Sequence, residues 1–167
     1  LLAIKIFPLV GSCIKSLAVE SCLRSVSAKP ESDRPYPALD PVVLVRQFRP
    51  VLEVEMLELP AGKLDVPGED RATAARRELV EEAGLDARDL VELGRFYNSI
   101  GFCDEETTVY LATDLKATAP EAASVEEQYL TVERVPIGEV EGLIADGTIT
   151  DAKTVIGLLQ ALRRLGR

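Results

Sequence analysis

Residues 62–85, GKLDVPGEDRATAARRELVEEAGL, decide the fold, because they place several charged residues in one short helix behind a loop punctuated by glycine. Nearly every residue from 72 to 83 is a good helix former, and Gly84 stands where a helix would end in a left-handed residue. The sequence therefore predicts a helix over 72–83. Because residues three and four apart share a helix face, Glu78, Glu81 and Glu82 crowd one side of it.

Three glutamates on one side repel one another, and the cations of this helix, Arg76 and Arg77, come just before them. A hard divalent cation would relieve the repulsion, because Mg2+ and Mn2+ favour carboxylate and carbonyl oxygens. The chain has no histidine, which removes the usual zinc ligand and the usual general base at neutral pH. The pattern therefore predicts a divalent-metal site for phosphate chemistry that uses carboxylates.

This segment resembles the signature of the Nudix hydrolases, G-x5-E-x7-R-E-U-x-E-E-x-G-U, where U is a bulky aliphatic residue. One departure exists, since six residues rather than five separate the first glycine from the first glutamate, and loops absorb such insertions at little cost. From Glu69 onward the spacing is kept. The specified positions are filled by Gly62, Glu69, Arg77, Glu78, Leu79, Glu81, Glu82, Gly84 and Leu85.

The flanking segments are similar to the ADP-ribose pyrophosphatase branch of that family. They are VVLVRQFRP (42–50), LELPAGKLD (57–65) and YNSIGFCDEETTVYLATDL (97–115), and the likeness runs from 41 to about 165. The resemblance implies an α/β (α+β) fold, an α/β/α sandwich around a mixed sheet. It also implies metal-dependent hydrolysis of a nucleoside diphosphate sugar, with ADP-ribose giving AMP and ribose 5-phosphate.

The resemblance also assigns roles residue by residue. Metal ligands would be Glu78, Glu82 and the backbone carbonyl of Ala61, with Glu81 as a further ligand or a contact to metal-bound water. Arg77 would orient these carboxylates, and Glu69 would pair with Arg77 or join an outer metal shell.

Three more positions are predicted around the substrate. Glu105, in the loop between Gly101 and Thr107, would activate or position water, although an acidic loop tip is the alternative. Arg46 and Arg49 are candidates for gripping phosphate, because a guanidinium offers fixed and always-charged donors. Either could equally be a surface arginine beside a strand. The expected cofactor is Mg2+ or Mn2+, with activity that rises toward alkaline pH.

Length and composition suit one ordinary domain. The chain has 167 residues, 47% hydrophobic and 28% charged. A net charge of −9 disfavours nucleic acid and anionic membranes as partners. The three cysteines, Cys13, Cys22 and Cys103, include no Cys-x-x-Cys pair, so we expect a reducing cytoplasm rather than a disulfide framework.

Alternation of apolar and polar residues predicts the remaining elements. Strands are expected at 42–48, 53–59, 93–97, 107–112 and 130–135. Two further helices are expected at 137–145 and 152–165, the second capped by Thr150 or Asp151.

Residues 1–40 are expected to form an atypical segment, extended or partly disordered, ahead of a Nudix domain at 41–167. Residues 1–10 are apolar, residues 11–28 mix Ser, Cys and Leu without clean periodicity, and the prolines at 30, 35, 37 and 41 are typical of a linker or an extended loop. No strand is predicted there. The resemblance implies a homodimer where this segment permits one.

Alternatives remain for the function. The signature predicts which linkage is cleaved but not the shape of the substrate-binding pocket, so another nucleoside diphosphate derivative is the closest alternative. A nucleotide-sensing domain without turnover is a second, and the intact set of Arg77, Glu78, Glu81 and Glu82 argues against it. A chain left structurally inert by its altered first segment is a third.

Overall fold

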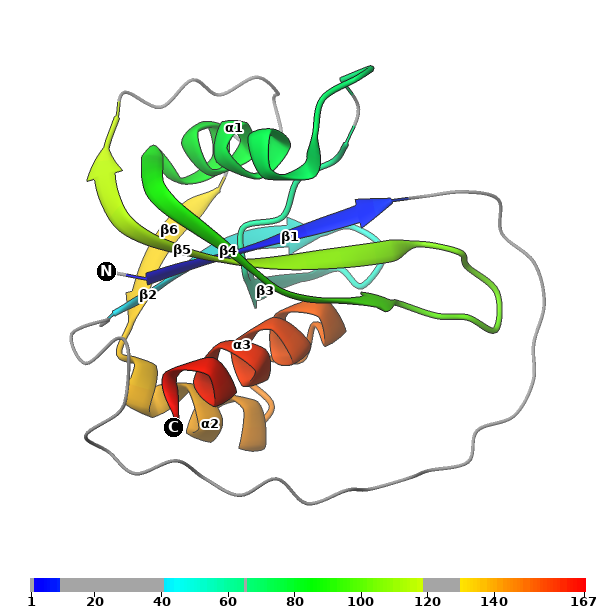
Figure 1. The fold of residues 1–167 in the computed structure, drawn as a ribbon. Coiled ribbons are helices and arrows are strands. Elements are labelled where there is room, and N and C mark those ends of the chain that lie inside the picture. Colours follow the sequence, from blue (N-terminus) through cyan, green and yellow to red (C-terminus); the bar gives the residue numbers. More distant parts are fainter. Residues whose placement is uncertain (1, 10–40, 65, 119–129) are drawn as a thin grey trace.

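The computed structural model of the chain describes residues 2–9, 41–64, 66–118 and 130–167. Six strands form one mixed sheet, with the order β3-β2-β1-β5-β4 and with β6 paired to β2 (Figure 1). Their bounds are Leu2–Leu9 (β1), Val42–Arg49 (β2), Val54–Glu58 (β3), Leu85–Tyr97 (β4), Glu106–Ala117 (β5) and Thr131–Val135 (β6).

Strand β1 was not predicted. It lies inside the sheet, where it runs parallel to β2, with Leu2 opposite Val42, and antiparallel to β5, with Ile4 opposite Leu111. Its apolar residues do not alternate with polar ones, and Lys5 and Pro8 interrupt them, so periodicity does not identify the strand. The predicted boundary between a segment 1–40 and a domain 41–167 stays a prediction, and residues 10–40 lie outside the described residues.

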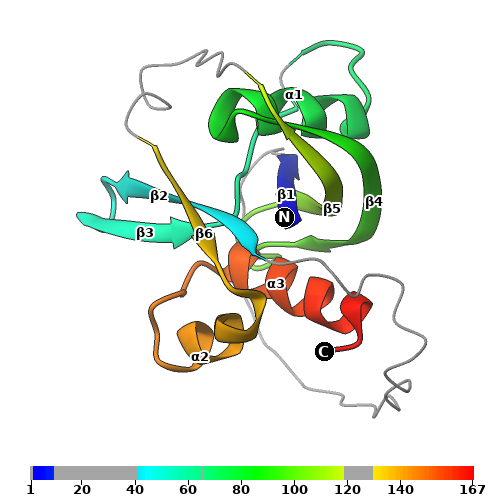
Figure 2. The ribbon, with the colours of Figure 1, turned by 90° about the vertical axis from the view of Figure 1, so that its left-hand side faces the viewer.

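Helices cover both faces of the sheet, so the predicted α/β/α sandwich is confirmed. Helix α1 (Arg71–Ala83) lies on one face, and α2 (Val140–Ala145) and α3 (Ala152–Leu165) lie on the other (Figures 1 and 2). No helix among residues 2–9, 41–64, 66–118 and 130–167 is long and apolar enough to cross a membrane.

Two apolar clusters hold these layers together, and alternation along β2 supplies both. Val42 and Leu44 pack into the cluster that contains Leu158 of α3. Val43 packs with Leu79 of α1 in the other cluster. Because successive strand residues point to opposite faces, even-numbered residues of β2 lie on the α3 side and odd-numbered residues on the α1 side.

Three elements differ from the predictions by more than one residue. Strand β4 begins at Leu85 rather than residue 93, because buried Leu85 and Ala87 alternate with charged residues that disguise the strand. Strand β5 extends to Ala117 rather than 112. The predicted helix at 137–145 is a 3₁₀ turn at Ile137–Glu139 followed by the short helix α2.

Candidate metal and phosphate site

Both ends of helix α1 are capped by residues of the signature segment. The Asp70 carboxylate accepts hydrogen bonds from the backbone N–H groups of Ala72 and Thr73, at 3.0 and 3.1 Å. At the other end Gly84 has a φ of 60°, and its N–H bonds back to the last turn, as the sequence predicts. These caps fix where the helix begins and ends, and therefore which way its glutamates point.

Arg77 joins three of the predicted carboxylates. Its Nε and Nη2 donate to the two oxygens of Glu69, at 3.2 and 3.0 Å. Its Nη1 donates to Glu78 at 3.2 Å and to Glu81 at 3.0 Å. Hydrogen bonding to Glu69 raises the pKa of Arg77 most; burial opposes the rise, and the charges of Glu78 and Glu81 add to it. Arg77 therefore contacts three of the carboxylates that the resemblance assigns to the site, and its orienting role stays a prediction.

Glu78 is nearly buried and lies against the glycine of the loop. Its Oε1 accepts a hydrogen bond from the Lys63 backbone N–H at 3.1 Å. A Cβ placed on Gly62 would lie 2.0 Å from Glu78 Cδ, closer than any real contact. Glycine at 62 is therefore required for this approach of backbone to carboxylate, and it brings the Ala61–Gly62 backbone beside Glu78.

The charges of this region do not balance. One guanidinium pairs with Glu69, Glu78 and Glu81, whose side chains are 9%, 8% and 16% exposed. Glu82 adds another carboxylate one turn after Glu78. Partly buried anions in excess over their cation favour a bound divalent ion with oxygen ligands. The residues present thus fit such an ion, although within the described part of the chain no three Asp, Glu or Cys side chains converge as ligands.

The two predicted phosphate-binding arginines lie on opposite faces of the sheet. Arg46 shares the face of Leu44, on the α3 side, and pairs with Glu133 of β6. By the alternation of β2, Arg49 shares the face of Val43, on the α1 side. Hydrogen bonding to Glu58 raises the pKa of Arg49 most; burial opposes the rise, and the charges of Asp151 and Glu82 add to it. The structure therefore brings Arg49, and not Arg46, toward the carboxylate helix.

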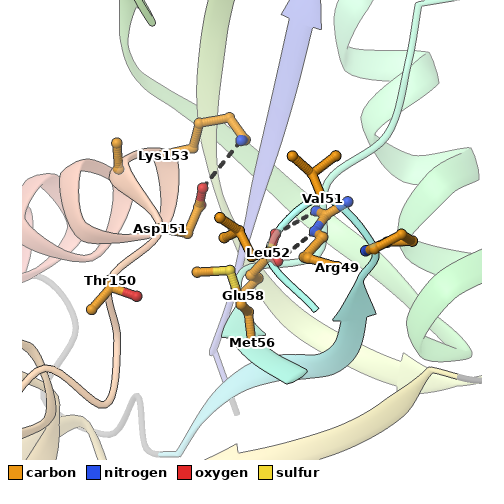
Figure 3. A pocket seen from close by; sticks show the side chains of 10 residues that line it. Arg49, Val51, Leu52, Met56, Glu58, Thr150, Asp151 and Lys153 are labelled. Carbon is orange, nitrogen blue, oxygen red and sulfur yellow. Dashed lines mark hydrogen bonds and ion pairs between the residues drawn. The ribbon is translucent and has the colours of Figure 1, made fainter. Parts of the chain in front are cut away.

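Arg49 is held by a second buried carboxylate. Its Nε and Nη2 donate to the two oxygens of Glu58, at 2.6 and 2.5 Å. Both residues line an open cavity of about 510 Å³ between the β2–β3 hairpin and the start of α3, which Lys153 and Asp151 close on the other side (Figure 3). These last two residues form an ion pair at 3.2 Å.

Glu105 is held within its own loop. Its carboxylate accepts a hydrogen bond from the Asn98 side chain, and its carbonyl accepts one from the Asn98 N–H at 3.0 Å. Glu106, the next residue, pairs at 2.8 Å with Arg71, the first residue of α1. This places the loop near the end of α1 opposite to Glu82. The structure does not bring Glu105 together with Glu78 and Glu82, and its role stays a prediction.

Sequence reasoning missed Glu58 and the Lys63 backbone N–H. A signal for Glu58 existed, because it stands between Leu57 and Leu59 in a short strand, where a carboxylate is out of place unless it has a partner. Nothing in the residue type of Lys63 could reveal a contact made by its backbone.

An α/β/α sandwich whose helix presents Glu78, Glu81 and Glu82 behind a close glycine loop defines the class of Nudix domains. The chain belongs to this family, since the model of the NUDIX domain family matches residues 33–156.

Comparison with individual relatives shows which members of the family this chain is similar to. The chain is 36% identical over 117 residues to the ADP-ribose pyrophosphatase of Bacillus subtilis (strain 168), covering 70% of this chain and 63% of that protein. It is 33% identical over 132 residues to the GDP-mannose pyrophosphatase of Cronobacter sakazakii (strain ATCC BAA-894), covering 75% and 68%. The chain thus spans less than two thirds of the length of the Bacillus subtilis protein.

A crystal structure of an ADP compounds hydrolase shares the fold. Its TM-score to this chain is 0.67, with 24% sequence identity over 96% of this chain and 71% of the other. The overlap includes the sandwich on which helix α1 and strand β2 are placed, so the likeness extends beyond the signature segment.

Proposed function

We propose that this protein hydrolyses the diphosphate linkage of a nucleoside diphosphate sugar, and that ADP-ribose, giving AMP and ribose 5-phosphate, is the preferred substrate. The observation that carries the proposal is the set of carboxylates around Arg77 with Glu78 packed on Gly62. The similarity to an ADP-ribose pyrophosphatase supports the choice of substrate.

In this proposal Glu78, Glu82 and the Ala61 carbonyl hold Mg2+ or Mn2+, with Glu81 as a further ligand. The ion, when bound, neutralises charge on the diphosphate and lowers the pKa of coordinated water. Arg77, held by Glu69, keeps the glutamates in place through hydrogen bonds to Glu78 and Glu81.

The remaining roles lie around the substrate. Arg49 donates to the non-bridging phosphate oxygens, where negative charge builds up during phosphoryl transfer. Arg46 remains a weaker candidate for phosphate, because it lies on the other face and already pairs with Glu133. Glu105 is retained as the residue that positions water, which requires its loop to approach α1 when substrate binds.

A second candidate substrate is GDP-mannose. The similarity to a GDP-mannose pyrophosphatase favours it, since the carboxylate site fixes the cleaved linkage but not the base or the sugar.

We also propose that the protein works in the cytoplasm as a homodimer. Sedimentation of the chain at micromolar concentration would test the homodimer.

The experiment that tests the proposal is release of AMP from ADP-ribose with Mg2+, beside GDP-mannose, other nucleotide sugars and nucleoside triphosphates, each with and without chelator. AMP release that favours ADP-ribose and stops with chelator is the expected result. Turnover that favours GDP-mannose would make GDP-mannose the preferred substrate and leave the proposed diphosphate hydrolysis unchanged. If the protein binds these nucleotides but hydrolyses none of them, its function would be nucleotide sensing rather than catalysis.

A further inference from the structure

We propose that Glu58 is a positioning residue, which fixes the guanidinium of Arg49 in the orientation that grips the substrate diphosphate. This inference rests on the proposed function and adds a residue that the signature segment does not contain. It follows from the burial of Glu58, the geometry of its contact with Arg49 and the face of the sheet on which both lie.

The contact between Arg49 and Glu58 is bidentate, because both carboxylate oxygens accept a hydrogen bond from the guanidinium, and we call this arrangement the fork. Glu58 Oε1 accepts from Arg49 Nε at 2.6 Å, and Oε2 accepts from Nη2 at 2.5 Å. The Glu58 side chain is 2% exposed, whereas that of Arg49 is 39% exposed. The buried Glu58 carboxylate therefore has little freedom to move, and its two hydrogen bonds hold the planar guanidinium of Arg49 in one orientation.

The fork leaves part of Arg49 for another anion. A guanidinium has five N–H donors, and two of them bond Glu58, so the Nη1 group and one Nη2 hydrogen remain. Arg49 lines the cavity of Figure 3 and lies on the α1 face of the sheet. The charges of Asp151, before α3, and of Glu82, on α1, both act on Arg49. The arginine is therefore within electrostatic reach of the carboxylate helix, where the proposed metal would hold the diphosphate.

Burial of Glu58 is hard to explain by stability alone. Taking a carboxylate out of water opposes folding, and a buried ion pair replaced by apolar residues often leaves a protein equally or more stable. The chain neighbours of Glu58 are buried apolar residues, Leu57 in β3 and Leu59 just after the strand. The proposed role explains why a carboxylate lies at position 58, because only an acceptor with two oxygens can orient the Arg49 guanidinium in this way.

The matched control is the Arg95–Glu92 pair of β4. Arg95 also uses Nε and Nη2 to bind both oxygens of its glutamate, at 2.9 Å each. This pair is exposed, with 47% and 37% of the side chains accessible, and it joins residues three apart in one strand. Glu92→Gln therefore breaks the same kind of fork without touching the proposed site.

The test measures kcat and KM for ADP-ribose with saturating Mg2+, and binding of α,β-methylene-ADP by calorimetry. The variants are Glu58→Gln, Arg49→Met, the double variant of both, and Glu92→Gln, with folding checked by urea unfolding. A glutamine presents an N–H₂ group to the arginine and cannot accept the fork. We expect Glu58→Gln to raise KM and the probe Kd about tenfold, the size of one charge-assisted hydrogen bond, with kcat within about threefold.

Two further results are expected. Glu92→Gln should match the wild type, and Glu58→Gln should add nothing in the Arg49→Met background, since Glu58 acts through Arg49. Should Glu58→Gln fail to fold, Arg49→Lys decides instead. It keeps a cation beside Glu58 but cannot form the fork, so the same rise in KM is expected.

The inference is overturned if Glu58→Gln, or in its place Arg49→Lys, keeps the wild-type KM, or if the loss falls on kcat alone. It is also overturned if Glu58→Gln raises KM equally with and without Arg49. A wild type that neither cleaves ADP-ribose nor binds the probe would remove the proposed function and the positioning role together. An active wild type with an unaffected Glu58→Gln would remove only the positioning role.

Discussion

The two charged regions of the molecule are built on different rules. At the start of α3 and in the β2–β3 hairpin, charges match one to one, with Arg49 on Glu58 and Lys153 on Asp151. Around α1, by contrast, Arg77 serves Glu69, in the loop before the helix, and Glu78 and Glu81 on it. Glu82 is a further carboxylate of the helix. We call the first region balanced, because each cation there has one carboxylate, and the second unbalanced, because one cation is shared among several carboxylates. A bound divalent ion would complete the second arrangement.

The largest effect should come from removing one charge of the unbalanced region. Glu82→Gln keeps the shape of the side chain and deletes a proposed metal-binding charge, so AMP release from ADP-ribose should fall by about a thousandfold or more. The fold should remain, which circular dichroism would show. The control is Glu141→Gln, an exposed glutamate of α2. Equal loss in the control, or retained activity in Glu82→Gln, would refute the ligand assignment.

The next effect should come from disturbing Glu78 through its neighbour. In Gly62→Ala the new methyl would overlap Glu78 Cδ, and the flexible carboxylate would move rather than the backbone. We expect activity to fall by about a hundredfold, with a stability loss of about 1 kcal/mol. Gly138→Ala is the control, because a Cβ there meets nothing within 4 Å. A fully active Gly62→Ala would show that the close approach is not needed.

Metal should stabilise the unbalanced region without substrate. Mg2+ at about a hundred times its Kd should raise the free energy of unfolding by roughly 2.7 kcal/mol, because it binds the folded state alone. Urea unfolding with Mg2+ and with chelator measures the difference. The difference should shrink in Glu82→Gln and persist in Glu141→Gln; an unchanged difference in Glu82→Gln would place the ion elsewhere.

The smallest effect belongs to the balanced region. Asp151 caps α3 by accepting from the Thr154 N–H at 2.8 Å, so Asp151→Ala should cost about 1 kcal/mol. Burial opposes ionisation of Asp151, but the Lys153 charge and the Thr154 hydrogen bonds outweigh it and lower the pKa of Asp151.

The pH dependence of that cost follows from the lowered pKa. Asp151 contributes its charge-linked stability at pH values above its unfolded pKa of about 3.9 and loses it as pH falls through the lower folded pKa. The cost of Asp151→Ala, measured by urea unfolding, should therefore be smaller at pH 2 than at pH 7. Asp151→Asn keeps a cap without the charge and should cost less than alanine. A cost for alanine that is independent of pH would contradict the linkage.

The sequence predicted the fold and the carboxylate helix well, for local reasons. Helix α1, its Gly84 end and the Arg77 contacts all follow from spacing within one segment. The apolar residues of β1 do not alternate with polar ones, and Pro8 argues against a central strand. In the early half of β4, Asp86 and Asp89 have low strand propensity, which outweighs the alternation there. The Arg49–Glu58 fork depends on the register of β2 and β3, in which Arg49 lies opposite Val54 and Val45 opposite Glu58, and pairing between strands is not visible in either strand alone.

The central claim is that the excess carboxylates of α1 hold a divalent cation, and Mn2+ binding followed by electron paramagnetic resonance tests it without any substrate. Wild type, Glu82→Gln and Glu141→Gln would be titrated at neutral pH. We expect the wild type and Glu141→Gln to bind Mn2+ alike, and Glu82→Gln to bind at least about tenfold more weakly, as loss of a charged ligand requires. Equal affinity in all three proteins would contradict the account.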